Sequence, residues 1–370
     1  MKIIFLLASL GSGGAERVVS LLANKMCEDG HEVQIISLKF NDVYYHIDER
    51  VKVVKAMEHT PNRLIELFWL RHYIQKEKPD VVIPFTEGVY CFTILSLLGT
   101  GIPIIASERL DPAAMSLSRK MLKRLLLPYA DWLVVQTESI KAYFPKSIQK
   151  KTSVIYNPVR EEVFSLPRTS SLTPTPSPKG EGSIKCEEKL NRIISVARLY
   201  PQKNQKMMIE AFAKIADEFP DWQLVIFGEG PLRSSLELLI KSLQLEGRVL
   251  LPGRTEQVID ELRKSKIFCL SSDYEGMSNS MIEAMCVGLP IISTKVSGTE
   301  ELIKDGENGF LVEVGDECSL SDCMSELISS PALMEDISFK NKKLASLFSL
   351  NFIIDKWIDL INEVKNESQN

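Results

Sequence analysis

The sequence predicts an α/β protein with two doubly wound parallel-sheet domains in its 370 residues. Short runs of Ile, Val and Leu alternate with helical stretches in both halves of the chain. Such runs, without polar alternation, are typical of strands buried in a parallel sheet. A stretch rich in Pro, Gly and Ser interrupts the alternation near the middle. The length suits two domains of ordinary size.

That interruption sets the expected domain boundaries. Residues 1–160 form the first domain, and residues 161–190 form a disordered linker that contains Ser-Leu-Thr-Pro-Thr-Pro-Ser-Pro. Alternation then resumes, so residues 191–345 form the second domain. Residues 346–370 form a last helical segment.

Composition excludes several classes of protein. A net charge of −5 without interleaved basic and aromatic residues disfavours nucleic-acid binding. The seven cysteines include no C-x-x-C pair, which predicts free thiols in a reducing, cytoplasmic compartment. The four histidines show no ligand spacing, so no metal site is expected. The apolar start is interpreted as a buried strand rather than a signal peptide, because a Gly-rich loop and a charged helix follow it.

The first domain opens with strand 2–8, a glycine loop, a helix and strand 32–38. The loop is not a dinucleotide fingerprint, because Glu16 stands at the third glycine position. Gly13 and Gly14 nevertheless allow a ligand to approach the backbone closely. A tight turn without function is the alternative. The alternation continues with helices at 62–78 and 87–98 and strands at 81–85, 102–107, 132–136 and 152–155.

The loop after strand 102–107 contains Glu108 and Arg109. Loops at the carboxyl ends of parallel strands carry ligand contacts, so both residues are site candidates. A local ion pair on the surface is the alternative. Residues 118–127 form a helix with a basic side and an apolar side. Such a helix can lie on an anionic membrane, or it can pack its apolar side on the sheet as an ordinary domain helix.

The second domain begins with strand 192–196, which is followed by Arg198 and Lys203. Two cations at the carboxyl end of a strand can neutralise a diphosphate, since Arg grips it bidentately and Lys acts as a point charge. Two solvated surface cations are the alternative. Further strands are expected at 223–227, 249–251, 267–270 and 290–293, and residues 305–310 are interpreted as a hairpin-type turn.

Residues 273–294 organise this domain. Glu275 follows a short strand, and Glu283 lies in the next helix, whose first turn contains Ser278, Asn279 and Ser280. Free amides at a helix start make an anion site, and carboxylates accept hydrogen bonds from hydroxyls. A phosphate site flanked by two carboxylates fits a sugar nucleotide.

The Glu275-x7-Glu283 unit, followed by Ala-Met-x-x-Gly-x-Pro, resembles the signature of family 4 retaining glycosyltransferases with the GT-B fold. The resemblance covers nearly the whole chain outside the linker. It implies two Rossmann-like domains facing across a cleft, with residues 346–370 crossing back onto the first domain. It also implies a nucleotide-sugar donor on the second domain and an acceptor on the first.

The resemblance assigns roles on the donor side. Arg198 and Lys203 would hold the diphosphate, Glu283 the ribose and Glu275 the donor sugar, with Arg198, Lys203 and Glu275 counted as catalytic. No metal or other cofactor is implied. Front-face transfer, in which the leaving phosphate takes the acceptor proton, is inherited with the family. Further donor contacts are implied at Gly228, Arg254, Gly276, Met277, Ser278 and Asn279.

On the acceptor side the resemblance implies contacts from Gly13, Gly14, Glu16, Glu108 and Arg109. The Ser-Glu-Arg form is similar to that of members that extend lipid-linked oligosaccharides or polysaccharide repeat units, including N-acetylgalactosaminyl and galactosyl transferases. Two partners are therefore expected: a nucleotide-sugar donor, with UDP as the favoured nucleotide, and a lipid-linked glycan acceptor. Peripheral contact with a membrane is a further hypothesis.

The chain departs from the family pattern at two points. Many relatives have a histidine near the Ser-Glu-Arg loop and this chain has none, and Ser297 replaces a glycine. Two other functions remain open. A sugar-nucleotide epimerase of the same architecture would need an acid/base pair, often with His, but the second half has no histidine. A non-catalytic sugar-nucleotide-binding protein would not hydrolyse donor in the absence of acceptor.

Overall fold

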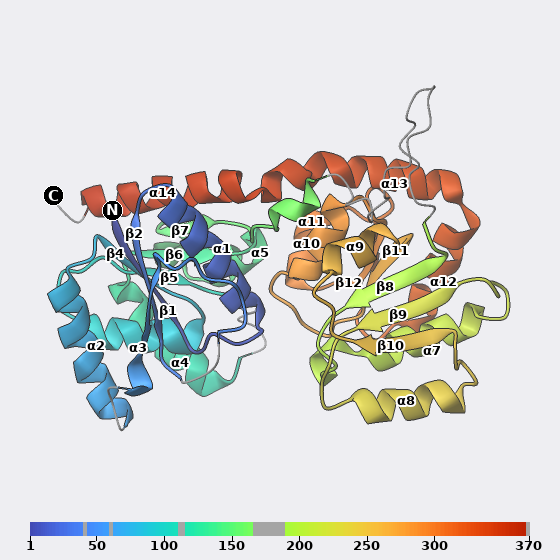
Figure 1. The fold of residues 1–370 in the computed structure, drawn as a ribbon, viewed down its shortest axis with the longest axis horizontal. Coiled ribbons are helices and arrows are strands. Elements are labelled where there is room, and N and C mark those ends of the chain that lie inside the picture. The colour runs from blue at the N-terminus through green and yellow to red at the C-terminus, as the bar shows by residue number, and fades with distance from the viewer. Residues whose placement is uncertain (40–42, 59–61, 110–114, 166–188, 368–370) are drawn as a thin grey trace, which may run out of the picture. The chain divides into compact units, whose positions relative to one another are not determined.

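The computed structural model describes residues 1–39, 43–58, 62–109, 115–165 and 189–367 (Figure 1). The described chain forms two compact units. Unit 1 contains residues 1–160, 274–279 and 346–370, and unit 2 contains residues 161–273 and 280–345. Most of the predicted linker, residues 166–188, lies outside the described residues.

Unit 1 is built from parallel strands joined by helices. Its elements are β1 (Lys2–Leu7), α1 (Gly14–Glu28), β2 (Glu32–Ser37), β3 (Lys52–Lys55), α2 (Arg63–Glu77), β4 (Val81–Pro84), α3 (Glu87–Leu97), β5 (Ile105–Ser107), α4 (Leu117–Leu126), β6 (Trp132–Val135), α5 (Glu138–Tyr143), α6 (Lys146–Gln149), β7 (Thr152–Val154) and α14 (Leu350–Glu367).

The strands of unit 1 form a sheet of order β3-β2-β1-β4 and a sheet of order β5-β6-β7, with parallel pairing throughout. Isolated parallel bridges at Val82–Ile104 and Phe85–Ser107 connect the two sheets. Strand β3 was not predicted from the sequence. Its four residues are too few for a clear pattern, and it pairs only at the edge of the sheet.

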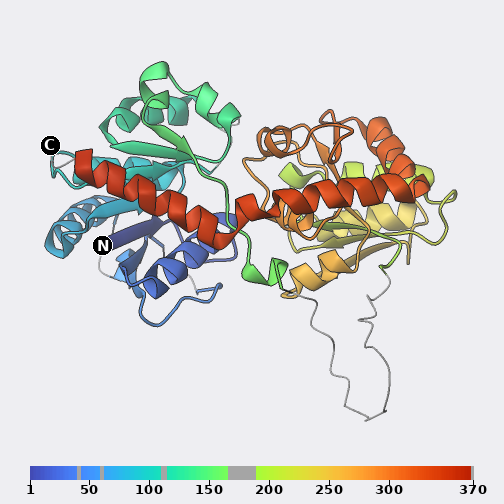
Figure 2. The same cartoon turned by 90° about the horizontal axis from the view of Figure 1, so that it is seen from above.

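Helices cover both faces of these sheets (Figures 1 and 2). Helices α1 and α14 share a core with β1 and β2, in which Trp357 of α14 is fully buried and stacks on Phe85 with ring centroids 6.0 Å apart. Helices α2 and α3 pack into the core on the other face. An ion pair of 2.6 Å between Lys365 and Asp80 also holds α14 on unit 1.

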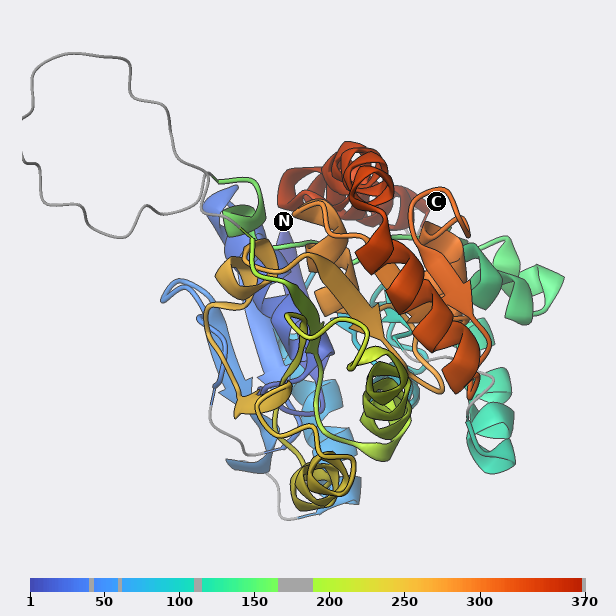
Figure 3. The same cartoon turned by 90° about the vertical axis from the view of Figure 1, so that its right-hand side faces the viewer.

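Unit 2 is a single parallel sheet of order β10-β9-β8-β11-β12-β13 with helices on both faces (Figures 1 and 3). Its elements are β8 (Arg192–Val196), α7 (Gln205–Ile215), β9 (Gln223–Phe227), α8 (Arg233–Ser242), β10 (Val249–Gly253), α9 (Val258–Arg263), β11 (Ile267–Leu270), α10 (Asn279–Cys286), β12 (Ile291–Thr294), α11 (Ser297–Leu302), β13 (Phe310–Val312), α12 (Glu317–Ser329) and α13 (Pro331–Leu344).

One predicted turn in unit 2 is wrong. Residues 305–310 do form a tight turn, with a φ of 72° at Gly306. However, it leads into β13, which pairs with β12 in parallel rather than as a hairpin. The preceding helix α11 reverses the chain direction, and the sequence analysis did not predict that helix.

No helix in the described parts of the chain is long and apolar enough to cross a bilayer. Among the same residues, four of the free cysteines are buried in the two units: Cys27, Cys91, Cys269 and Cys286.

Candidate active site

Arg198 and Lys203 lie just beyond the carboxyl end of β8, on the loop that leads into α7. Lys203 ends a short 3-10 helix, Pro201–Lys203, and the next residue, Asn204, adopts a left-handed φ of 44° and caps α7 by accepting the amide of Met207. The Arg198 guanidinium lies 5.0 Å from the centre of the Tyr200 ring. Both predicted cations are therefore presented at the ligand-binding edge of a parallel sheet.

Neighbouring loops hold this cation-bearing segment in place. The Ser271 hydroxyl donates to the carbonyls of Lys203 and Asn204 at 2.9 Å, and Asn204 Nδ2 donates to Asp273 Oδ1 at 2.8 Å. On the other side the segment contacts Gly228, where an added Cβ would lie 1.9 Å from the carbonyl oxygen of Ala197. Gly228 is thus required for close packing of two loops at this edge.

Glu283 lies inside α10, and its exposed fraction is 1%. The Ser280 hydroxyl in the first turn of this helix donates to the carbonyl of Val196 at 2.7 Å, which ties the start of α10 to the end of β8. The structure therefore places Glu283, Arg198 and Lys203 on elements that meet at one edge of unit 2.

The turn before α10 groups with unit 1. Glu275 is partly exposed there, whereas Gly276, Met277 and Ser278 are buried. Asn279, the first residue of α10, accepts a hydrogen bond of 2.7 Å from Asn157 Nδ2 within the same unit.

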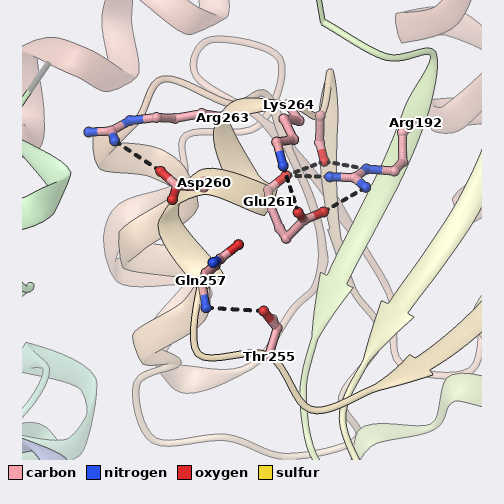
Figure 4. Close-up of polar contacts among 8 residues, drawn as sticks. Arg192, Thr255, Gln257, Asp260, Glu261, Arg263 and Lys264 are labelled. Atoms are coloured by element: carbon pink, nitrogen blue, oxygen red, sulfur yellow. Dashed lines mark hydrogen bonds and ion pairs between the residues drawn. The ribbon is translucent and has the colours of Figure 1, made fainter. Parts of the chain in front are cut away.

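Arg254 is exposed and directly follows β10. The next residue, Thr255, is labelled in Figure 4. The loop after β10 is held by a hydrogen bond of 3.0 Å from the Gln257 amide to the Thr255 hydroxyl.

Arg192 lies at the amino end of β8, the opposite end of this strand from Arg198. Figure 4 shows that it donates a hydrogen bond of 2.9 Å to the Glu261 carboxylate. Burial alone would raise the pKa of Glu261, but hydrogen bonds from Lys264 and Arg192 lower it below its usual value. Arg192 is therefore a structural cation, in contrast to the exposed Arg198.

The glycine loop of unit 1 precedes α1. Gly13 is the N-cap residue, and an added Cβ would meet Glu16 Oε2 at 2.1 Å. The Glu16 carboxylate thus folds back over the start of its own helix, where it also accepts the Ser9 hydroxyl at 3.0 Å. A carboxylate in this position is stabilised by the free amides of the first helical turn.

Glu108 and Arg109 are both buried, so the surface ion pair considered above is wrong. Glu108 Oε2 accepts hydrogen bonds from Tyr90 at 2.9 Å and from Lys123 at 3.2 Å. The Arg109 guanidinium instead donates to Asn157 Oδ1 at 2.7 Å and lies 4.4 Å from the centre of the Phe85 ring. Burial lowers the pKa of Arg109 to about 9, which leaves it charged at neutral pH.

Helix α4 does not pack its apolar side on the sheet. Leu117, Met121 and Leu125 are 80%, 67% and 66% exposed, whereas Lys123 is the residue of this helix that is buried. The interpretation of residues 118–127 as an ordinary domain helix is therefore wrong. Of its basic residues, Lys123 is buried, whereas Arg119 and Arg124 are exposed.

Sequence reasoning missed Tyr90, Lys123 and Asn157 as partners of the Glu108–Arg109 loop. In the sequence, Lys123 is one of several cations on the basic side of residues 118–127, and Asn157 lies near the predicted end of the first domain at residue 160. Asn157 follows β7 at the same sheet edge as the loop after β5, so the switch-point rule could have found it. Within the described ranges, no group of three His, Cys, Asp or Glu residues could hold a metal ion.

Two family models match the chain, one in each half. The model for glycosyltransferase family 4 matches residues 12–163, and the model for glycosyl transferases group 1 matches residues 181–344. Together they include every predicted site residue, from Gly13 in the first half to Glu283 in the second.

The matches to similar proteins cover nearly the full chain. One is a GalNAc-α-(1→4)-GalNAc-α-(1→3)-diNAcBac-PP-undecaprenol α-1,4-N-acetyl-D-galactosaminyltransferase of Campylobacter jejuni, 30% identical over 99% of both chains. Another from the same organism is an N-acetylgalactosamine-N,N'-diacetylbacillosaminyl-diphospho-undecaprenol 4-α-N-acetylgalactosaminyltransferase, 30% identical over 94% of this chain and 95% of the relative. The solved structure of Anabaena HepE with UDP and glucose has a TM-score of 0.81 and 18% identity, and the match covers 98% of this chain and all of HepE. The predicted GT-B fold is confirmed.

Proposed function

This chain belongs to glycosyltransferase family 4, and on that premise we propose that it is a retaining enzyme of surface polysaccharide or oligosaccharide biosynthesis. It moves a hexose or N-acetylhexosamine from a nucleotide-diphosphate sugar to a lipid-linked glycan. UDP is the proposed nucleotide. The resemblance of its Ser-Glu-Arg loop to galactosyl and N-acetylgalactosaminyl transferases supports UDP, as does the solved HepE complex with UDP and glucose.

One observation carries the proposal: the two cations that follow β8 are fixed at the edge of unit 2 beside the loop of Gly228 and the start of α10. Departure of a nucleoside diphosphate places negative charge on its outer phosphate. Cations and helix-end amides that are already in position stabilise this charge without reorganisation. Arg198 and Lys203 would bind the diphosphate, and Glu283 would bind the ribose hydroxyls.

The proposed reaction needs no metal, because the cations neutralise the leaving group. The acceptor oxygen forms a bond to the anomeric carbon on the face from which the diphosphate leaves. As the bond between the anomeric carbon and the phosphate oxygen breaks, the proton of the acceptor hydroxyl passes to that oxygen. Configuration is retained because the new bond forms on the same face. Glu275 would bind the donor sugar in this step.

The proposed acceptor is an undecaprenyl-diphosphate-linked glycan, as in the names of the two Campylobacter relatives. Gly13, Gly14, Glu16 and Arg109 in unit 1 would contact it, and the buried Glu108 would support Arg109. Such an acceptor places the reaction at a membrane surface, and buried free thiols fit the cytoplasmic side.

Helix α4 is the proposed point of membrane contact. Its exposed leucines and methionine can enter the headgroup region of a bilayer, and its exposed basic residues are attracted to anionic lipids. We expect the protein to float with phosphatidylglycerol vesicles at low salt, and the Met121→Glu/Leu125→Glu variant to float much less. Equal flotation of the two proteins would exclude α4 as the contact.

Transfer can be tested with a panel of UDP- and GDP-sugars. A donor that binds should raise the melting temperature, because it stabilises only the folded state. The donors that do so are then incubated with undecaprenyl-diphosphate-linked glycans, and the products are analysed by mass spectrometry and by NMR for anomeric configuration. Inversion at the anomeric carbon, or donor loss without a glycosylated lipid, would contradict the proposal.

A further inference from the structure

Helix α4 is attached to unit 1 by charge along its length, and by apolar packing only at its end, where Leu126 packs against a core of this unit. A surface helix normally turns its apolar stripe toward the core, whereas α4 exposes Leu117, Met121 and Leu125 and buries Lys123. The Lys123 side chain is 4% exposed, and its ammonium group lies 5.0 Å from the centre of the Phe144 ring.

Two buried carboxylates of unit 1 form ion pairs with basic side chains of α4. Lys123 Nζ lies 3.2 Å from Glu108 Oε2, and the Glu108 side chain has no exposed surface. One turn earlier, Arg119 Nε lies 3.7 Å from Glu87 Oε2, and the Glu87 side chain is 4% exposed. Removing one partner of a buried pair leaves the other charge uncompensated. The Arg119 side chain is 61% exposed, so the Lys123–Glu108 pair is the one of the two that is buried on both sides and that holds α4 against unit 1.

The Lys123 pair continues directly to the acceptor loop. Glu108 Oε1 accepts the backbone amide of Arg109 at 3.1 Å, while Oε2 holds Lys123. The Arg109 guanidinium donates to Asn157, and its buried Nε and Nη2 atoms have no hydrogen-bond partner among the described residues. Glu108 is the group that connects α4 with Arg109.

We propose that Lys123 is a positioning residue. When α4 binds an anionic bilayer, the buried ion pair between Lys123 and Glu108 fixes the position of the Arg109 backbone. This inference rests on the proposed function, because it assumes that the loop of Arg109 contacts a lipid-linked acceptor. Membrane contact by the exposed side of α4 and acceptor binding by Arg109 are thereby linked through Lys123 on the buried side of this helix.

The kinetic test compares Lys123→Met, Lys123→Arg and the charge-balanced Lys123→Met/Glu108→Gln variant. The assay uses UDP-GalNAc and a GalNAc-terminated undecaprenyl-diphosphate glycan in phosphatidylglycerol vesicles. We expect Lys123→Met to raise the KM for the glycan roughly tenfold or more, since small displacements of positioning groups have effects of that size. The KM for UDP-GalNAc should stay unchanged, and Lys123→Arg should restore most of the loss.

The double variant separates positioning from folding. It removes the unpaired buried charge, so its melting temperature should recover toward the wild-type value while its KM for the glycan stays raised. A wild-type KM for the glycan in Lys123→Met, or in the double variant, would overturn the proposal.

A second readout does not depend on activity. Phosphatidylglycerol vesicles should slow amide hydrogen exchange in α4 and at Arg109 of the wild-type protein, but only in α4 of Lys123→Met. Equal protection at Arg109 in both proteins would overturn the coupling. If the wild-type protein shows this protection pattern but transfers no sugar, the proposed function fails and the coupling stands.

Discussion

At the scale of single residues, position along strand β8 separates a buried cation from an exposed one. Arg192 begins β8 and is buried in a network with Glu261, whereas Arg198 follows the same strand and is exposed. The sequence could predict this difference, because the switch-point rule needs only the direction of the strand. It could not predict the Glu108–Lys123 pair, since nothing local indicates which of several cations on a helix turns inward.

Lys203→Ala tests the leaving-group role of this residue. Removing one preorganised group that stabilises developing charge costs roughly 10²–10³-fold in kcat, and we expect a loss of that order with an unchanged melting temperature. The matched control is Lys206→Ala, three residues along the chain. Lys206 is 68% exposed and pairs only loosely with Glu210, at 3.7 Å. Transfer rates measured with saturating donor give the comparison. A loss below about threefold in Lys203→Ala would contradict the assignment, since exposed ion pairs alone contribute that little.

At the scale of elements, several strands followed from the apolar pattern. Strand β8 spans residues 192–196 as the pattern predicted, since a buried apolar run is a local signal. Helix α4 shows where such reasoning fails. Its amphipathic pattern was clear, but the direction of each side depends on buried carboxylates in α3 and after β5. Those acids are distant in sequence, so the pattern alone predicted the helix and not its orientation.

Helix α14 tests the packing of an element onto unit 1. Trp357 has no exposed surface and stacks on Phe85, so Trp357→Ala should lower the free energy of unfolding of unit 1 by about 3–5 kcal/mol. Phe352→Ala on the same helix is the control, because Phe352 is 38% exposed and its truncation should change stability little. Urea denaturation followed by circular dichroism measures both variants. Equal destabilisation by the two substitutions would show that α14 is not held by its buried face.

At the scale of the whole molecule, the predicted site residues are distributed over two units that have separate cores. Unit 2 has an apolar core around β8, β9 and α7, and unit 1 has a core on each face of its sheets. The predicted donor cations, Gly228, Arg254 and Glu283 belong to unit 2, whereas the predicted donor contacts at residues 275–279 group with the glycine loop and Arg109 in unit 1. Composition and alternation were enough to predict two α/β domains, because each repeats the same local pattern.

This division predicts where a nucleotide alone acts. UDP carries neither the transferred sugar nor the acceptor glycan, so it can test the nucleotide contacts alone. We expect it to slow amide hydrogen exchange chiefly in the loops of unit 2 that follow β8, β9 and β10, and in the first turns of α10. Bound ligand suppresses the local openings that permit exchange. Strands β1 and β2 of unit 1 serve as the internal reference and should exchange at unchanged rates. The Lys203→Ala variant should lose the protection after β8 at the same UDP concentration. Protection confined to the glycine loop of unit 1 would instead place the nucleotide on that unit and reverse the proposed assignment of donor and acceptor.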